Sequence, residues 1–161
     1  MKNILIIGLL SFFSLGNAQT KSETINWINQ KFSGDRTGFN NGYYSFVCFT
    51  KIDLNGNVVN TSYRRDRISG EDKDISTVNL KNLSYTSVYT RTDGGFIFFY
   101  ARCENGKKCV KNNSIYDNYL SYMDDMLLGM IEENYAPDIE QRGIKAFKTA
   151  IRFFNNKKEA F

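Results

Sequence analysis

Hydrophobic and polar residues alternate through most of the middle of the chain, which is the pattern of β-strands that bury one face. The alternating runs are separated by Asn55-Gly56, Gly94-Gly95 and Asn105-Gly106, and such pairs favour tight hairpin turns. The run at 126–133 also fits a helical turn, but its short length favours a strand. We predict strands at residues 43–52, 57–65, 75–80, 84–90, 96–102, 107–111 and 126–133, with a polar excursion over 112–125.

The spacing of hydrophobic residues changes to a helical period on both sides of this segment. Residues 20–32 place Ile25, Ile28 and Phe32 on one helical face, with Ser22 as the candidate N-cap. A second helix is predicted after Pro137, where Asp138 and Gln141 have the spacing of a capping box, and it ends near Asn155. The apolar face of this helix consists of Ile144, Phe147, Ile151 and Phe154.

These elements predict an α+β fold, namely a strongly bent antiparallel sheet or barrel of about six to seven strands with a short N-terminal helix and an amphipathic C-terminal helix packed on it. The order of elements from Tyr43 to Asn155 resembles the pleckstrin-homology-like fold, in which a C-terminal helix closes a barrel. The layout is also similar to small secreted single-domain proteins of unknown function. Because the pleckstrin-homology-like fold hosts lipid, peptide and protein binders, the resemblance implies no particular ligand.

The first residues of the chain have the composition of a secretory signal peptide. Lys2 precedes an apolar run from Ile4 to Leu15, and Gly16-Asn17-Ala18 supplies small residues for cleavage. A retained membrane anchor is the alternative, but the run is shorter than the roughly 20 residues that span a bilayer. We therefore predict a signal peptide at 1–18, a single domain at 19–161, no membrane span after cleavage, and a secreted or periplasmic location.

The amino-acid composition excludes or disfavours several classes of function. The chain contains no His, so it cannot form a Ser-His-Asp site, a Cys-His site or a His-liganded zinc site. Its net charge of +4 is too small to indicate a nucleic-acid partner. We expect no cofactor and no metal site, and the absence of imidazole lowers the expectation of catalysis without excluding enzymes that use paired carboxylates.

The three cysteines allow one disulfide in an oxidising compartment. Cys103 and Cys109 bracket the predicted Asn105-Gly106 turn and are the favoured pair, although their spacing requires a three-residue or bulged loop. Cys48 lies among aromatic residues and is interpreted as a buried free thiol, with a Cys48–Cys103 bridge as the rival pairing.

Two groups of charged residues are candidates for chemistry. Cations on a predicted loop and on the C-terminal helix would bind a phosphate or carboxylate, including a lipid headgroup, if they met in space, but a solvated surface is the favoured interpretation. Four carboxylates flank the strand at 126–133 and would serve a glycosidase-like hydrolase only if they converged. The cations are Arg64, Arg65, Arg67, Lys145, Lys148 and Arg152, and the carboxylates are Asp124, Asp125, Glu132 and Glu133.

The tyrosines of the polar segment 116–122 are candidates for contact with a partner, because tyrosine combines an apolar ring with a polar hydroxyl group. They are Tyr116, Tyr119 and Tyr122. We predict a secreted or periplasmic, non-enzymatic domain that binds an unidentified protein or small ligand. The alternatives are a carboxylate hydrolase that works without His and a weak binder of anions or lipid headgroups.

Overall fold

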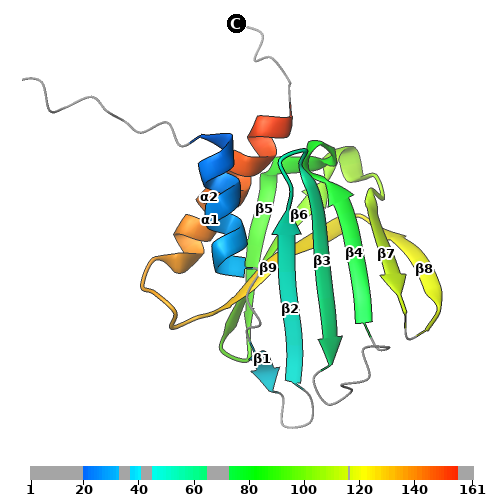
Figure 1. The fold of residues 1–161 in the computed structure, drawn as a ribbon, viewed down its shortest axis with the longest axis horizontal. Helices are drawn as coiled ribbons and strands as arrows, with labels where there is room; N and C mark the ends of the chain where they lie inside the picture. The colour runs from blue at the N-terminus through cyan, green and yellow to red at the C-terminus, as the bar shows by residue number, and fades with distance from the viewer. Residues whose placement is uncertain (1–19, 33–36, 41–44, 65–72, 116, 156–161) are drawn as a thin grey trace, which may run out of the picture.

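The fold is α+β, with two helices packed against two antiparallel sheets (Figure 1). The computed structural model describes residues 20–32, 37–40, 45–64, 73–115 and 117–155. The larger sheet has six strands in the order β1-β2-β3-β4-β7-β8, and the smaller has three in the order β5-β6-β9. The strands are β1 Thr37–Asn40, β2 Ser45–Ile52, β3 Asn57–Arg64, β4 Lys73–Asn79, β5 Leu83–Asp93, β6 Phe96–Cys103, β7 Val110–Ser114, β8 Tyr119–Met123 and β9 Asp125–Glu132.

Three predictions about the strands are wrong. Residues 37–40 form β1, which alternation did not reveal, and residues 119–123 of the expected polar excursion form β8. Asn105-Gly106 is not a hairpin, because β6 pairs with β5 and β9 while β7 pairs with β4 and β8. A single 3-10 turn at Glu104–Gly106 instead carries the chain from the smaller sheet to the larger one. The ambiguous run near 126–133 is a strand, as predicted.

The helices are α1 Lys21–Phe32 and α2 Ile139–Phe154. The expected N-cap Ser22 is wrong: Thr20 and Glu23 form a capping box, in which the Glu23 backbone N–H donates to the Thr20 hydroxyl and the Thr20 N–H donates to the Glu23 carboxylate. The Thr20 N–H and the Thr20 hydroxyl both donate to the Glu23 carboxylate and lower its pKa. The capping box expected at Asp138 is also absent, since the Asp138 side chain caps no backbone N–H.

The hydrophobic core lies between the two helices, one face of the smaller sheet and the near ends of β2, β3, β4 and β7. At its centre the rings of Phe32, Phe99 and Phe147 lie 5.0 to 5.6 Å apart between centroids. Gly143 of α2 lets Phe99 approach closely, because a Cβ at residue 143 would lie 2.4 Å from the ring. A further tie joins α1 to β2: the Asn29 carboxamide accepts from the Ile52 backbone N–H and donates to the Ile52 carbonyl, both at 2.8 Å.

The Cys103–Cys109 disulfide is formed, with Cα atoms 5.8 Å apart, and Cys48 is a buried free cysteine. The favoured pairing is therefore confirmed and the Cys48–Cys103 alternative is wrong. Because β6 and β7 belong to different sheets, the bridge closes the corner between the sheets rather than stapling a hairpin. Closing so short a loop contributes about 2 kcal/mol to stability in the chain-entropy model.

The predicted signal peptide at 1–18 lies outside the described residues. In the described part of the chain, neither helix is long and apolar enough to cross a membrane.

Candidate functional site

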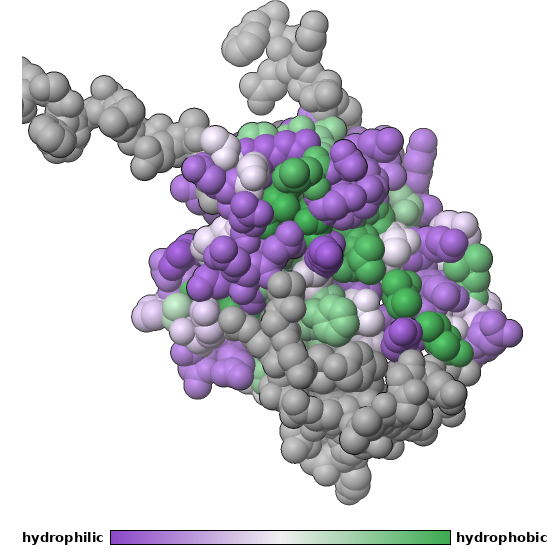
Figure 2. All heavy atoms as spheres, in the orientation of Figure 1, coloured by the Kyte–Doolittle hydropathy of each residue, from purple (hydrophilic) through white to green (hydrophobic). Residues whose placement is uncertain are grey.

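Strand β8 exposes large side chains at the edge of the larger sheet. Tyr119, Leu120 and Tyr122 are 62, 48 and 54 % exposed, although they form most of a five-residue strand. Elsewhere on the side of the molecule seen in Figure 2, hydrophobic residues lie in small groups between hydrophilic ones. Natural proteins usually protect edge strands with charges, bulges or covering segments, and β8 itself carries no charged residue. An exposed aromatic edge of this kind is a candidate interaction surface.

The second edge of β8 pairs with no strand in the part of the chain that the structure describes. Among the described residues, the backbone of Tyr119–Tyr122 is hydrogen-bonded on the β7 side alone. Exposed carboxylates stand just outside both ends of the strand, Asp117 before it and Asp124 after it. The predicted contact residues Tyr119 and Tyr122 thus lie on one edge strand, whereas Tyr116 lies outside the described residues.

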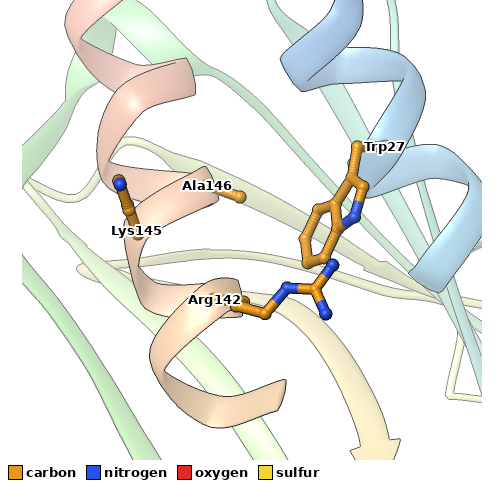
Figure 3. A pocket seen from close by; sticks show the side chains of 4 residues that line it. All are labelled: Trp27, Arg142, Lys145 and Ala146. Carbon is orange, nitrogen blue, oxygen red and sulfur yellow. The ribbon is translucent and has the colours of Figure 1, made fainter. Parts of the chain in front are cut away.

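A hollow of about 290 Å³ lies between α1 and α2, lined by Trp27, Arg142, Lys145 and Ala146 (Figure 3). Trp27 and Ala146 face each other from the two helices, and the Arg142 guanidinium lies 5.5 Å from the centroid of the indole ring. Asp138 already counters the charge of Arg142, with 3.6 Å between their side-chain atoms. The hollow is close to the lower size limit of small-molecule sites, about 300 Å³.

The cations predicted to bind an anion are distributed over different parts of the fold. Lys145 lines the hollow beside α1, whereas the Arg152 guanidinium lies 4.5 Å from the ring centroid of Tyr85 in β5. Lys148 lies between them in sequence on α2 and is half-buried. The backbone of Arg64 lies at the far end of β3 from the turn at Gly56, which contacts Phe154 of α2. Arg65 and Arg67 lie outside the described residues.

The four candidate carboxylates are separated by the length of β9. Asp124 and Asp125 stand at its start, and Glu132 and Glu133 at its end. Seven residues of extended strand place the two pairs about 23 Å apart. Glycoside hydrolases hold their two carboxyl groups about 5 to 10 Å apart, so this arrangement does not supply that pairing.

Sequence reasoning missed an organised cluster on the smaller sheet. The paired residues Tyr89 and Tyr100 stack with centroids 5.3 Å apart, and the Arg91 guanidinium lies 5.6 and 5.5 Å from the two ring centroids. The Tyr89 hydroxyl donates to Asp125 at 2.9 Å. Burial, followed by this hydrogen bond, raises the pKa of Tyr89. Finding this cluster from sequence would have required the cross-strand register of β5 and β6, which the alternation of residues alone does not specify.

The free thiol of Cys48 gives a pH-dependent prediction. Burial raises its pKa to about 11, and the Asn60 amide offsets only part of that rise. Unfolded thiols ionise near pH 8.5, so between about pH 9 and 11 unfolding releases a proton and the native state loses relative stability. The thiol therefore contributes stability that is present below about pH 9 and lost as pH rises through about 11.

Urea unfolding of the wild type and of Cys48→Ala across this pH range measures the effect. As the pH rises, the wild type should lose stability relative to Cys48→Ala, because only the wild type has the Cys48 thiol that ionises in this range. Native Cys48 should also resist thiol reagents at pH 8 until the protein unfolds. A stability difference that stays constant with pH would contradict the assignment.

Within the described residues, no group of three or more His, Cys, Asp or Glu side chains could hold a metal ion. Comparisons of the chain with protein family models, with curated proteins and with solved structures found no match. The pleckstrin-homology-like resemblance therefore stays a prediction.

Proposed function

We propose that the protein is an extracytoplasmic, non-enzymatic binding domain that captures an extended strand of another protein along the free edge of β8. The observation that carries the proposal is the exposure of Tyr119, Leu120 and Tyr122 on an edge strand whose outer backbone has no partner among the described residues. Strand addition uses such an edge: backbone hydrogen bonds provide affinity, and alternate side chains provide specificity. The signal-peptide pattern and the Cys103–Cys109 disulfide support the location.

The charges beside β8 favour a basic partner over a second copy of the chain. In an antiparallel pair of two β8 strands, the Asp117 end of one would meet the Asp124 end of the other. In a parallel pair, each aspartate would meet its own counterpart. Like charges oppose each other in both arrangements, which disfavours self-pairing. A partner strand with an uncharged centre and lysine or arginine at both ends would instead be attracted.

The test uses the mature protein, isotopically labelled for NMR, and a synthetic peptide of alternating valine and threonine residues flanked by lysines. We expect this peptide to bind and to slow hydrogen exchange of amides in Tyr119–Tyr122, whereas the same peptide flanked by aspartates should bind at least about tenfold more weakly. Protein recovered from the periplasm or the medium should begin at Gln19, as the predicted cleavage requires.

Variants separate the edge of β8 from the rest of the sheet. Tyr122→Lys should weaken peptide binding by about tenfold or more, because it places a charge on the docking edge. Val59→Lys is the matched control: Val59 is 39 % exposed and belongs to the same cross-strand row, but it lies on the interior strand β3. Equal binding of both peptides, or equal loss in both variants, would refute the proposal. A dimer that Tyr122→Lys dissociates would assign the edge to self-association instead.

A further inference from the structure

The inner face of the larger sheet changes from apolar to polar along its strands. Near the helices, Ile52, Val58 and Val78 occupy one cross-strand row and belong to the hydrophobic core. Residues two positions further along each strand lie on the same face, because side chains alternate across a sheet. There the register produces an upper polar row of Thr50, Asn60, Ser76, Asn112 and Ser121, and then a lower polar row of Cys48, Ser62, Asp74, Ser114 and Tyr119.

The upper row is buried at its β2 end and half-buried toward β8, whereas the lower row combines buried side chains, Cys48 and Ser114, with the exposed Asp74 and Tyr119. Thr50 and Asn60 are only 0 and 3 % exposed, where β9 lies against β2 and β3. Ser76, Asn112 and Ser121 are half-buried, and Tyr119 ends the lower row on the exposed edge strand. The two rows therefore form a continuous polar face that leads from the interior to the surface at β8.

The buried end of this face has hydrogen-bonding capacity that the described residues do not satisfy. The Asn60 carboxamide nitrogen donates to the Thr50 hydroxyl at 2.8 Å and to the Cys48 sulfur at 3.2 Å, while the Asn60 carbonyl oxygen has no partner among the described residues. Exchanging the amide nitrogen and oxygen would leave the nitrogen unpaired instead. A buried polar atom without a partner costs about 1–3 kcal/mol, so such an atom calls for an explanation.

The open half of the face also has donors that lack a partner among the described residues. The Ser76 hydroxyl donates to the Asn112 carbonyl oxygen at 2.8 Å, which leaves the amide hydrogens of Asn112 available. Tyr100 of the smaller sheet lies near the lower row: burial raises its pKa, and Cys48 is close enough to add to that rise. Neither row contains lysine or arginine, and Asp74 is the single charged side chain in them.

We infer that the polar face binds a neutral oligosaccharide. Sugar hydroxyls both donate and accept hydrogen bonds, and so do the serine, threonine and asparagine side chains that make up most of both rows. The absence of cations from the rows disfavours phosphorylated or sulfated ligands, whose charge would also be repelled by Asp74. The exposed ring of Tyr119 offers a surface on which a sugar ring packs at the open end.

The experiment titrates the mature, isotopically labelled protein with maltotetraose, cellotetraose and N-acetylated chitotetraose. At least one of these sugars should shift the side-chain amide signals of Asn60 and Asn112 in a saturable way. Asn112→Leu should weaken that binding by about tenfold, which corresponds to the loss of one or two hydrogen bonds. Asn113→Leu is the matched control, because Asn113 is the next residue of β7 and lies on the opposite face of the sheet.

Ser121→Ala provides a milder second variant in case Asn112→Leu disturbs folding, and thermal unfolding monitors both. Tyr122→Lys should leave sugar binding unchanged, because Tyr122 and Ser121 lie on opposite faces of β8. The inference is overturned if none of the three sugars shifts the two amides, if oligogalacturonate binds more tightly than every neutral sugar, or if Asn113→Leu weakens binding as much as Asn112→Leu. None of these results would affect strand capture at the β8 edge.

Discussion

Replacing Phe99 with alanine should lower the free energy of unfolding by about 3–5 kcal/mol, the range for deleting a fully buried phenylalanine. Phe99 is 0 % exposed, and its ring packs against those of Phe32 and Phe147. Gly143 also approaches the same ring. The substitution therefore opens a cavity where both helices meet the smaller sheet, and the surrounding aromatic rings relax only partly into it. Urea unfolding followed by circular dichroism measures the loss.

Phe96→Ala is the control for this prediction. Phe96 belongs to the same strand β6 and has the same side chain, but it is half-buried and lies outside the core cluster. Its replacement should cost about 1 kcal/mol, in line with substitutions away from the core. Equal losses for the two variants would show that the aromatic cluster is not the centre of the core.

Replacing Asn29 with alanine should cost about 3 kcal/mol, because it removes two hydrogen bonds and leaves the polar groups of a buried residue unpaired. The Asn29 carboxamide satisfies both backbone groups of Ile52, as a neighbouring strand would, and Ile52 is 1 % exposed. The variant should also increase hydrogen exchange of the Ile52 amide beyond the increase caused by the general loss of stability.

Two further variants sharpen this test. Asn29→Asp retains an acceptor for the Ile52 N–H but loses the donor to the Ile52 carbonyl, so its stability should lie between those of the wild type and Asn29→Ala. Gln30→Ala changes the next residue of α1, which is exposed, and should alter stability by less than about 0.5 kcal/mol. If Asn29→Ala resembled Gln30→Ala, the tie between α1 and β2 would not be a source of stability.

The local sequence pattern was sufficient to predict those helices and strands that bury only one face. Strand β6 was visible in sequence as an apolar run of β-forming residues, and α2 was visible as a helical period because it packs one face against the core. Strand β8 escaped detection for the opposite reason: both of its faces carry large side chains, Tyr119, Leu120 and Tyr122 are all exposed, and no alternating period marks it. The tyrosines of this segment are nevertheless conspicuous in the sequence, and this is why Tyr119 and Tyr122 are predicted contact residues.

Local pattern predicted strand pairing only across tight hairpins: the turns at Asn55-Gly56 and Gly94-Gly95 join paired strands, β2 with β3 and β5 with β6. Asn105-Gly106 has the composition of a hairpin turn, yet β7 pairs with β4, which lies far back in the sequence, and not with β6. The turn at Asn105-Gly106 only changes the direction of the chain. The partner of β7 is selected by the free energy of strand pairing and by the burial of both sheets. The same holds for Tyr89 and Tyr100, which stack only because the β5–β6 register brings them together.

From residue order one can read the class of the fold, both helices, most strands and the disulfide, since each depends on neighbours within a turn, a strand or a short loop. The polar face arose only on folding. Thr50, Asn60, Ser76, Asn112 and Ser121 are ordinary polar residues of five separate strands, and the antiparallel register aligns them in one row. Register is a property of pairs of distant segments, so a site assembled by register has no local signature.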